Sequence, residues 1–172
     1  MYIPAHFRFT DEELLLAFMQ QNAFATIISL VNGRPEATHL PFVIGRRNGE
    51  LLLQAHFAKA NAQWKSIGEG EALVIFIGPH AYISPQHYEK EQNVPTWNYI
   101  AVHAYGRATI LPDDAQALAV LEKSIASFEP AYQQQWDQLD EGYRQKMLKG
   151  IVAFEIVVSD LQGKKKLSQN RS

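Results

Sequence analysis

The segment Val94–Tyr99 brings together side chains that could hold a flat polar ligand. After its proline it carries an indole at Trp97, an amide at Asn98 and a phenol at Tyr99, and the apolar run 100–106 follows at once. Aromatic rings can stack on a planar ligand, and an amide can both donate and accept hydrogen bonds. Trp and Tyr are also common in cores, with their polar atoms satisfied nearby. The pattern predicts either a ligand site at the mouth of a strand or a loop that caps a core.

A second group of polar side chains has the chemistry of a phosphate site. His56, Lys59 and Asn61 lie close together where an extended segment is expected to meet a short helix. The start of a helix presents unpaired N–H groups to anions, and a lysine adds a positive charge. The alternative is that Lys59 is solvated and Asn61 only caps the helix. We expect Trp64 to anchor this helix by packing.

The stretch Thr38-His39-Leu40-Pro41 reads as a strand that a ligand could approach. Alternation of side chains places Thr38 and Leu40 on one face and His39 and Pro41 on the other, so one face would look inward and the other onto the ligand. A proline inside a strand favours an edge or a bulge, where backbone groups are accessible. His39 could instead be a core histidine with satisfied ring nitrogens.

Other reaction chemistries find little support in the sequence. It contains no cysteine, which excludes disulfides, thiolate ligands and cysteine nucleophiles. The histidines lack the spacings typical of helical metal sites, so no metal is expected, and no GxSxG or glycine-rich phosphate motif occurs. The basic cluster 164–166, with Arg171, is expected to be a solvated tail.

Length and charge narrow the class further. We expect the 172 residues to form a single domain, 1–172, with a core of its own. A net charge of −2 and a pI near 6.3 argue against direct DNA binding. The sequence shows neither a basic segment followed by an apolar run at its start nor a stretch of about 20 apolar residues, so a cytoplasmic protein away from membranes is expected.

The first half of the chain predicts a helix followed by a meander of strands. Thr10 and Glu13 have the spacing of a capping box for a helix over 11–21. The dipeptide Asn32-Gly33 favours a tight turn, and 46–49 repeats that signal. The expected elements are strands over 23–31, 36–44 and 50–56, a short helix over 59–67 and an apolar strand over 72–77.

The second half predicts a long loop and then a mixture of strands and helices. Residues 78–98 contain three prolines and three aromatic residues, which indicates a long functional loop. The expected elements after it are a strand over 99–111, a helix over 115–128, a second helix within 133–148 and a strand over 151–158. Such an antiparallel meander with inserted helices suits a small barrel.

Several separated blocks resemble the PaiB-type, FMN-binding "negative transcriptional regulator" family. These blocks are 1–7, 37–42, 56–64, 94–99 and 166–170. The resemblance implies a mainly β (α+β) fold, an antiparallel six-stranded split barrel of the FMN-binding type with peripheral helices, shared with pyridoxamine-phosphate oxidases and flavin reductases. It also implies a homodimer with FMN at the interface. Family members continue beyond the last block, whereas this sequence ends two residues after it.

The resemblance also assigns roles to particular residues. FMN would be bound by Thr38, His39, Leu40, Pro41, His56, Lys59, Asn61, Trp97, Asn98 and Tyr99, the last three reaching the flavin ring from the partner subunit. Lys166 and Gln169 are weaker candidates, because C-terminal segments return to the cofactor in this fold. Tyr82, Ser84, His87 and Tyr88 would face a substrate, although polar loop residues also commonly face solvent.

Three functions follow as hypotheses. The first is a flavin-dependent, oxidoreductase-like or flavin-sensing protein that acts on an unknown small molecule, with FMN supplying the redox chemistry. No obligatory acid or base stands out, so whether the protein is an enzyme is left open. The second is a transcriptional (negative) regulator that acts on DNA or through a partner; no recognition helix is evident. The third is a haem-binding split barrel, because relatives of this fold handle haem.

Overall fold

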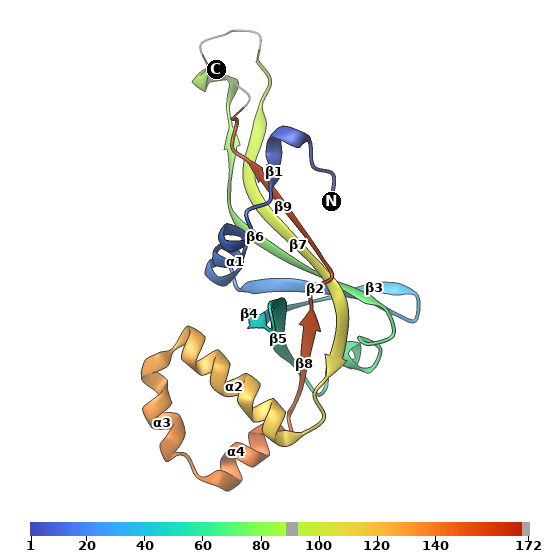
Figure 1. Cartoon of the computed structure of the whole chain (residues 1–172), viewed down its shortest axis with the longest axis vertical. Helices are drawn as coiled ribbons and strands as arrows, with labels where there is room; N and C mark the ends of the chain where they lie inside the picture. Colours follow the sequence, from blue (N-terminus) through green and yellow to red (C-terminus); the bar gives the residue numbers. More distant parts are fainter. Residues whose placement is uncertain (89–92, 170–172) are drawn as a thin grey trace.

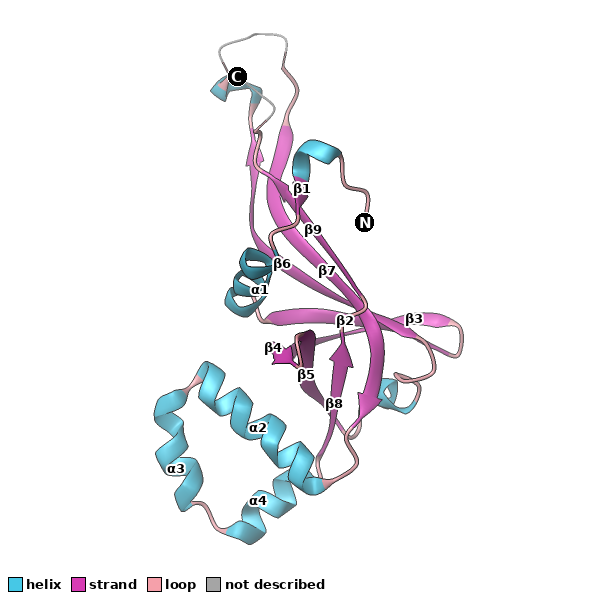
Figure 2. Ribbon diagram, viewed as in Figure 1, coloured by secondary structure: helices cyan, strands magenta, loops and turns pink. Residues whose placement is uncertain are grey.

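The computed structural model describes residues 1–88 and 93–169, apart from the side chain of His87. It shows an antiparallel sheet that is strongly curved, with helices at its margins (Figure 1, Figure 2). Among these residues, three short 3-10 helices lie outside the helical insertion, at Ala5–Phe7 (η1), Ala62–Lys65 (η2) and Pro85–His87 (η3).

The first helix, α1 (Glu12–Gln21), begins one residue later than the capping box predicts. Asp11 is the N-cap, and its carboxylate accepts hydrogen bonds from the backbone N–H groups of Glu13 and Leu14, both at 3.1 Å. The capping role assigned to Thr10 is therefore wrong, because the adjacent aspartate adopts the extended conformation and takes the cap position. Leu15 and Met19 of α1 are buried against the sheet.

Two tight hairpins follow, and both use the predicted Asn-Gly turns. Asn32 and Asn48 have φ of 52° and 53°, and the glycines after them have φ of 76° and 86°, as the preferred two-residue hairpin turn requires. The expected single strand over 36–44 is wrong, since Phe42 interrupts it and donates its N–H to the carbonyl of Ala23. The four strands are β2 (Phe24–Val31), β3 (Arg34–Pro41), β4 (Val43–Arg47) and β5 (Glu50–Ala58).

A long hairpin replaces much of the loop expected over 78–98. β6 (Glu71–Ile83) and β7 (Thr96–Ile110) pair along most of their lengths, with a shift in register between Ile77 and His80. The shift explains how Pro79 is tolerated inside a strand, because a bulge needs no ladder hydrogen bond at that point. Beyond it the two strands form a projecting segment, here called the arm, made of residues 80–88 and 93–99 (Figure 1).

Lysines 164–166 of the basic cluster expected to be a solvated tail belong to a strand, β9 (Asp160–Lys166), whereas Arg171 lies outside the described residues. It pairs with β7 over seven residues and with the short β1 (Arg8–Phe9) on its other side. Gly163 permits this close packing, because a Cβ there would lie 2.5 Å from a methyl carbon of Leu15 and even closer to the carbonyl of Phe9. The expectation of a solvated tail is wrong for these lysines, because the backbone of this charged segment is paired with a strand on each side.

The described strands give the split-barrel class predicted, with more strands than the six expected. Their order is β3-β2-β6-β7-β8-β5-β4, where β8 is Ile151–Val157, and β1 and β9 pair beside this path. The terminal strands β3 and β4 are not paired with each other, so the sheet stays open between them. The core between the two halves contains Phe42, Phe57, Phe76 and Phe154, all buried, with the rings of Phe57 and Phe154 stacked at 4.8 Å.

Between β7 and β8 the chain forms a helical insertion. It contains α2 (Asp114–Phe128), η4 (Pro130–Tyr132), α3 (Gln133–Gln138) and α4 (Glu141–Leu148), so the single second helix expected within 133–148 is in fact two. The break falls at Asp140, whose carboxylate accepts from the N–H of Tyr143 and caps α4. A small apolar cluster joins the insertion to β8. Among the described residues, no helix is long and apolar enough to cross a membrane.

Candidate functional site

The edge strand β3 shows the alternation that the sequence predicts. Leu40 is buried opposite Ala25, whereas His39 and Pro41 are exposed on the opposite face. Because β3 ends the sheet order, its second edge has no strand partner in the described part of the chain. The ring of His39 lies 2.9 Å from the hydroxyl of Thr26 at the surface, so the core-histidine alternative is wrong.

Thr38 and Asn61 are brought together by the loop after β5. Asn61 Nδ2 donates to Thr38 Oγ1 at 2.9 Å, and Thr38 Oγ1 donates to Oε1 of the buried Gln63 at 2.6 Å. Gln63 is a residue that the sequence reasoning missed, because an isolated glutamine after a strand carries no recognisable signal. The hydrogen bonds link the loop to the edge of β3.

The helix expected over 59–67 is only the short 3-10 helix η2. Its N-cap is Asn61, whose Oδ1 accepts from the N–H of Gln63 at 2.9 Å. A helix this short gives no basis for the anion site at a helix start that the sequence suggested. Lys59 is exposed, and its carbonyl accepts from the indole N–H of Trp64 at 3.0 Å, so Trp64 anchors the loop as expected.

His56 does not join Thr38 and Asn61. It pairs directly with Ala153 across β5 and β8, so the two side chains share one face of the sheet. Ala153 packs with Ala117 and Val120 of α2, which places His56 on the side covered by the helical insertion. Burial lowers the pKa of the His56 imidazole.

The arm carries the second group of candidate residues. Because side chains alternate along a strand, these residues lie on two opposite faces of β7. Trp97 and Tyr99 line an open apolar groove of about 600 Å³, whereas Asn98 projects from the other face of β7. The Trp97 ring lies 5.9 Å from the rings of both His80 and Tyr82. The remaining lining residues are Met1, Ile77, Ala101 and His103.

The C-terminal segment fixes the base of the arm. Ser168 Oγ donates to Asn98 Oδ1 at 2.8 Å and accepts from the phenol of Tyr88 at 3.1 Å. The Lys166 ammonium donates to the Trp97 carbonyl at 2.6 Å and to the Thr96 hydroxyl. Lys166 therefore contacts the arm rather than solvent alone.

The other substrate-side candidates lie near the end of the arm. Tyr82 is exposed, and Ser84 accepts from the N–H of Gln86 as the cap of η3. The side chain of His87 lies outside the described residues. Gln169 Nε2 donates to the carbonyls of His6 and Lys165, which ties the chain end to η1.

A buried charge and a ring nitrogen without a described partner lie next to the base of the arm, on the sheet face that carries the groove. The Lys164 ammonium lies 5.3 Å from the Tyr99 ring centre and 5.7 Å from that of Tyr2, and it donates to the Tyr2 carbonyl. His103 Nδ1 is buried without a hydrogen-bond partner among the described groups. Burial, and then the nearby terminal ammonium, lower the pKa of His103.

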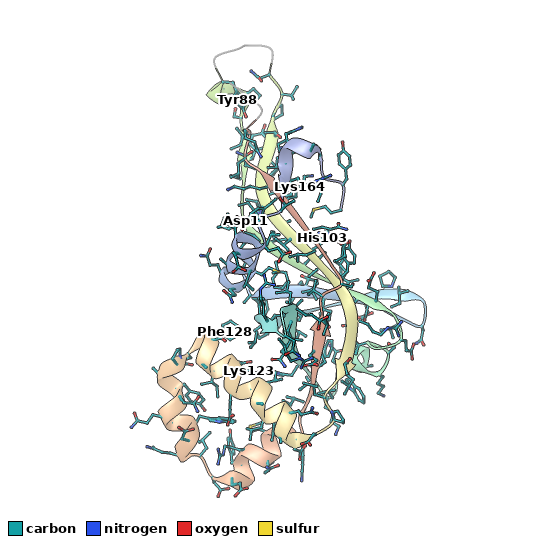
Figure 3. The ribbon with its side chains drawn as sticks, in the orientation of Figure 1. Asp11, Tyr88, His103, Lys123, Phe128 and Lys164 are labelled. Atoms are coloured by element: carbon teal, nitrogen blue, oxygen red, sulfur yellow. The ribbon has the colours of Figure 1, made fainter. Side chains whose placement is uncertain are left out.

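Within one chain the two groups of candidates stay apart. Thr38 lies on β3, and Lys59 and Asn61 lie in the loop after β5; the sheet outside the arm, together with this loop, is here called the body (Figure 1). Trp97, Asn98 and Tyr99 belong to the arm. Figure 3 shows Tyr88 near the end of the arm, far from Phe128 and Lys123, which lie on the helical insertion toward the other end of the molecule. In the described part of the chain, no cluster of His, Asp or Glu side chains has the arrangement of a metal site.

Comparison with known proteins identifies the class. Residues 1–160 match the sequence model of a family described as "Putative FMN-binding domain". The chain is 42% identical over 177 residues to the "Protease synthase and sporulation protein PAI 2" of Bacillus subtilis, covering 100% of this chain and 84% of that protein. An uncharacterized protein of Emericella nidulans is 31% identical over 173 residues, covering 78% and 69%.

Solved structures agree on the fold. The flavocytochrome Anf3 from Azotobacter vinelandii superposes with a TM-score of 0.76 at 15% identity, covering 96% of this chain and 73% of that one. An FAD and heme binding protein from Mycobacterium smegmatis gives 0.71 at 18% identity, covering 92% and 73%. Fold and sequence together define a flavin-binding split barrel.

The chain belongs to the FMN-binding domain family of the PaiB type, and its cofactor is FMN. The described side chains fit such a group. The amide of Asn61 reaches Thr38 on the edge strand β3, and the exposed Lys59 lies two residues earlier in the same loop, so this loop carries a neutral donor and a cation. An exposed indole at Trp97 offers a surface for a planar ring.

Proposed function

We propose that this protein works as a homodimer whose two FMN sites are each built from the body of one copy and the arm of the other. The observation that carries the proposal is an apolar sheet face that carries exposed side chains in the described part of the chain. Direct pairing puts the outward side chains of β2, β3, β6 and β7 on one side, here called the outer face. Its exposed apolar members are Phe24, Leu30, Ile77 and Trp97.

The presence of several exposed apolar side chains on one sheet face favours a protein–protein interface there. Phe24 is 72% exposed and Ile77 is 57% exposed, although both lie within regular strands and not at loop tips. Contiguous apolar patches on soluble proteins usually mark binding surfaces, and two-fold pairing of identical copies is the commonest way to cover one. A second copy of this chain is therefore the occupant that we propose.

The separation of the candidate residues supports a shared site. Lys59 and Asn61 lie at the body, whereas Trp97 and Tyr99 lie on the arm, so one chain does not surround a ligand with both groups. A two-fold axis through the outer face would bring each arm toward the partner's β3 edge. Lys59 and Asn61 would then bind the phosphate, and Trp97 would cover the ring.

Bound FMN would supply one- and two-electron redox chemistry, while the protein orients it and limits access of water. The residues proposed at the site include no paired acid and base. We therefore favour flavin-dependent electron transfer to a small molecule, or flavin sensing, over a reaction that needs a protein acid.

A regulatory role is the second candidate. It is favoured by the 42% identity to a Bacillus subtilis protein whose name refers to protease synthesis and sporulation. With a net charge of −2, action through a partner protein is the form that the sequence supports better than direct binding to DNA.

Subunit exchange tests the shared site. The variant K59A/N61A damages the body half, and W97A damages the arm half, so each homodimer should bind FMN weakly. A mixed dimer contains one intact composite site, and FMN binding measured by fluorescence should partly recover after mixing. The control mixture combines K59A/N61A with L14A, because Leu14 lies on α1 and belongs to neither half of the proposed site. No recovery despite verified exchange would contradict the proposal.

A further inference from the structure

The buried amide of Gln63 joins three segments of the body. Its side chain is 1% exposed, and Nε2 donates to Ser29 Oγ on β2 and to the Glu36 carbonyl on β3, both at 3.0 Å. Oε1 accepts from Thr38 Oγ1. Both N–H groups and the carbonyl oxygen are therefore paired, so the position of η2 against the β3 edge is set by one side chain.

Gln63, Thr38 and Asn61 form a closed ring of hydrogen bonds. The Gln63 backbone N–H donates to Asn61 Oδ1, Asn61 Nδ2 donates to Thr38 Oγ1, and Thr38 Oγ1 donates back to the Gln63 side chain. The ring fixes which end of the Asn61 amide is the NH2 group, because Oδ1 must face the backbone N–H. One N–H of Asn61 is used by Thr38, and the other has no partner among the described residues.

Because of the same ring, the Thr38 hydroxyl cannot donate a hydrogen bond to a ligand. A threonine hydroxyl has a single hydrogen, and here Gln63 accepts it. Thr38 therefore supports the site and has no hydrogen to offer a ligand. The donor left for a ligand is the second N–H of the half-buried Asn61, and the exposed Lys59 lies two residues earlier in the chain.

We propose that Gln63 is a positioning residue for the phosphate end of the flavin site: it holds Asn61 so that one amide N–H is directed at the phosphate. The inference rests on the proposed function, because it assumes that the junction of Lys59 and Asn61 binds phosphate. It adds a specificity consequence. Gln63 should matter for FMN and hardly at all for riboflavin, which lacks the phosphate.

The test compares the affinities of FMN and riboflavin in Gln63→Met, a substitution that keeps the side-chain length and removes the amide. We expect FMN to bind about tenfold more weakly, the effect of losing roughly one net hydrogen bond, while riboflavin binding changes less than about twofold. Gln54→Met is the matched control. Gln54 is also buried, with its amide paired to Lys123 and Glu155, and it lies away from η2.

A double-mutant cycle separates positioning from general damage. Once Asn61→Ala has removed the directed N–H, adding Gln63→Met should cause no further loss of FMN affinity. If Gln63→Met does not fold, Thr38→Val breaks the same ring with a smaller change, and Thr38→Ser preserves it. Thr38→Val should then lower FMN affinity selectively, and Thr38→Ser, which keeps the hydroxyl, should restore most of the lost affinity.

The outcomes distinguish the two claims. Equal losses for FMN and riboflavin, additive losses in the cycle, or unchanged FMN affinity in the variants would overturn the role of Gln63 while leaving FMN binding intact. Failure of the wild-type protein to bind FMN would instead overturn the proposed function, and the inference with it.

Discussion

The ammonium of Lys166 donates a hydrogen bond to the backbone carbonyl of Trp97 at 2.6 Å, which ties the end of β9 to the base of the arm. The two residues are far apart in the sequence, and the antiparallel pairing of Tyr99 with Lys166 brings them together. Ser168 continues the connection by donating to Asn98. The C-terminal segment is thus part of the structure that would present the arm to a second copy in the proposed dimer.

The outer face predicts a dimer that a single charge can disrupt. Ile77→Arg should shift the protein to monomer, since an unpaired guanidinium would be buried at the interface. Leu14→Arg is the matched control, because Leu14 is 56% exposed against 57% for Ile77 but lies on α1. Sedimentation at micromolar concentration measures both. A wild-type monomer, or a dimer that both variants preserve, would argue against this interface.

The contact of β9 with α1 and β1 predicts a large stability effect at one glycine. Gly163→Ala should lower the free energy of unfolding by about 1–3 kcal/mol, since its methyl group would overlap the carbonyl of Phe9 and a methyl of Leu15. Gly45→Ala is the control, because a Cβ there meets no atom within 4 Å. Urea unfolding of both variants checks the difference, and equal stability would contradict the close packing of β9 against β1 and α1.

The lowered pKa values of His56 and His103 predict a fall in stability at acid pH. Unfolding returns each imidazole to a pKa near 6.5, so below about pH 6.5 the unfolded chain binds protons that the folded chain does not. The free energy of unfolding should therefore keep its full value above that pH. It should decrease as the pH falls toward the lower pKa values that the two imidazoles have in the folded protein.

The double variant H56Q/H103Q checks this sign. It should show a smaller decrease between pH 7 and pH 5.5 than the wild type, at the same protein concentration and in urea unfolding followed by tryptophan fluorescence. The same decrease in both proteins would mean that other groups control the acid sensitivity.

The net charge of −2 predicts that the isolated protein does not bind duplex DNA sequence-specifically at physiological salt. Gel retardation with the DNA upstream of its own coding sequence is a direct check. A shifted band that survives excess nonspecific competitor would favour direct repression over action through a partner.

Local patterns predicted much of this fold, and the failures have physical reasons. Asn-Gly turns fix a backbone with positive φ, so both hairpins could be placed from four residues. The arm could not be predicted, because three prolines and three aromatic residues suggest a loop unless one knows that a bulge accommodates Pro79. β9 was missed because its lysines look solvated, whereas cross-strand partners decide their environment.

Some features of the candidate site could likewise be predicted from local patterns, and others could not. The inward and outward faces of β3 followed from alternation alone, and the capping role of Asn61 followed from its type and position. Gln63 and Ser168 could not be found, because each acts through hydrogen bonds to residues distant in the sequence. Where His56 lies depended on the helical insertion, which no local pattern around His56 reveals.

The most direct test of FMN binding by this protein is the visible absorption spectrum of the freshly purified protein, followed by titration with FMN and, separately, with haemin. The account predicts a flavin spectrum, release of FMN on denaturation, and saturation at one FMN per chain. Absence of FMN binding, or a stable haem spectrum formed in its place, would contradict it.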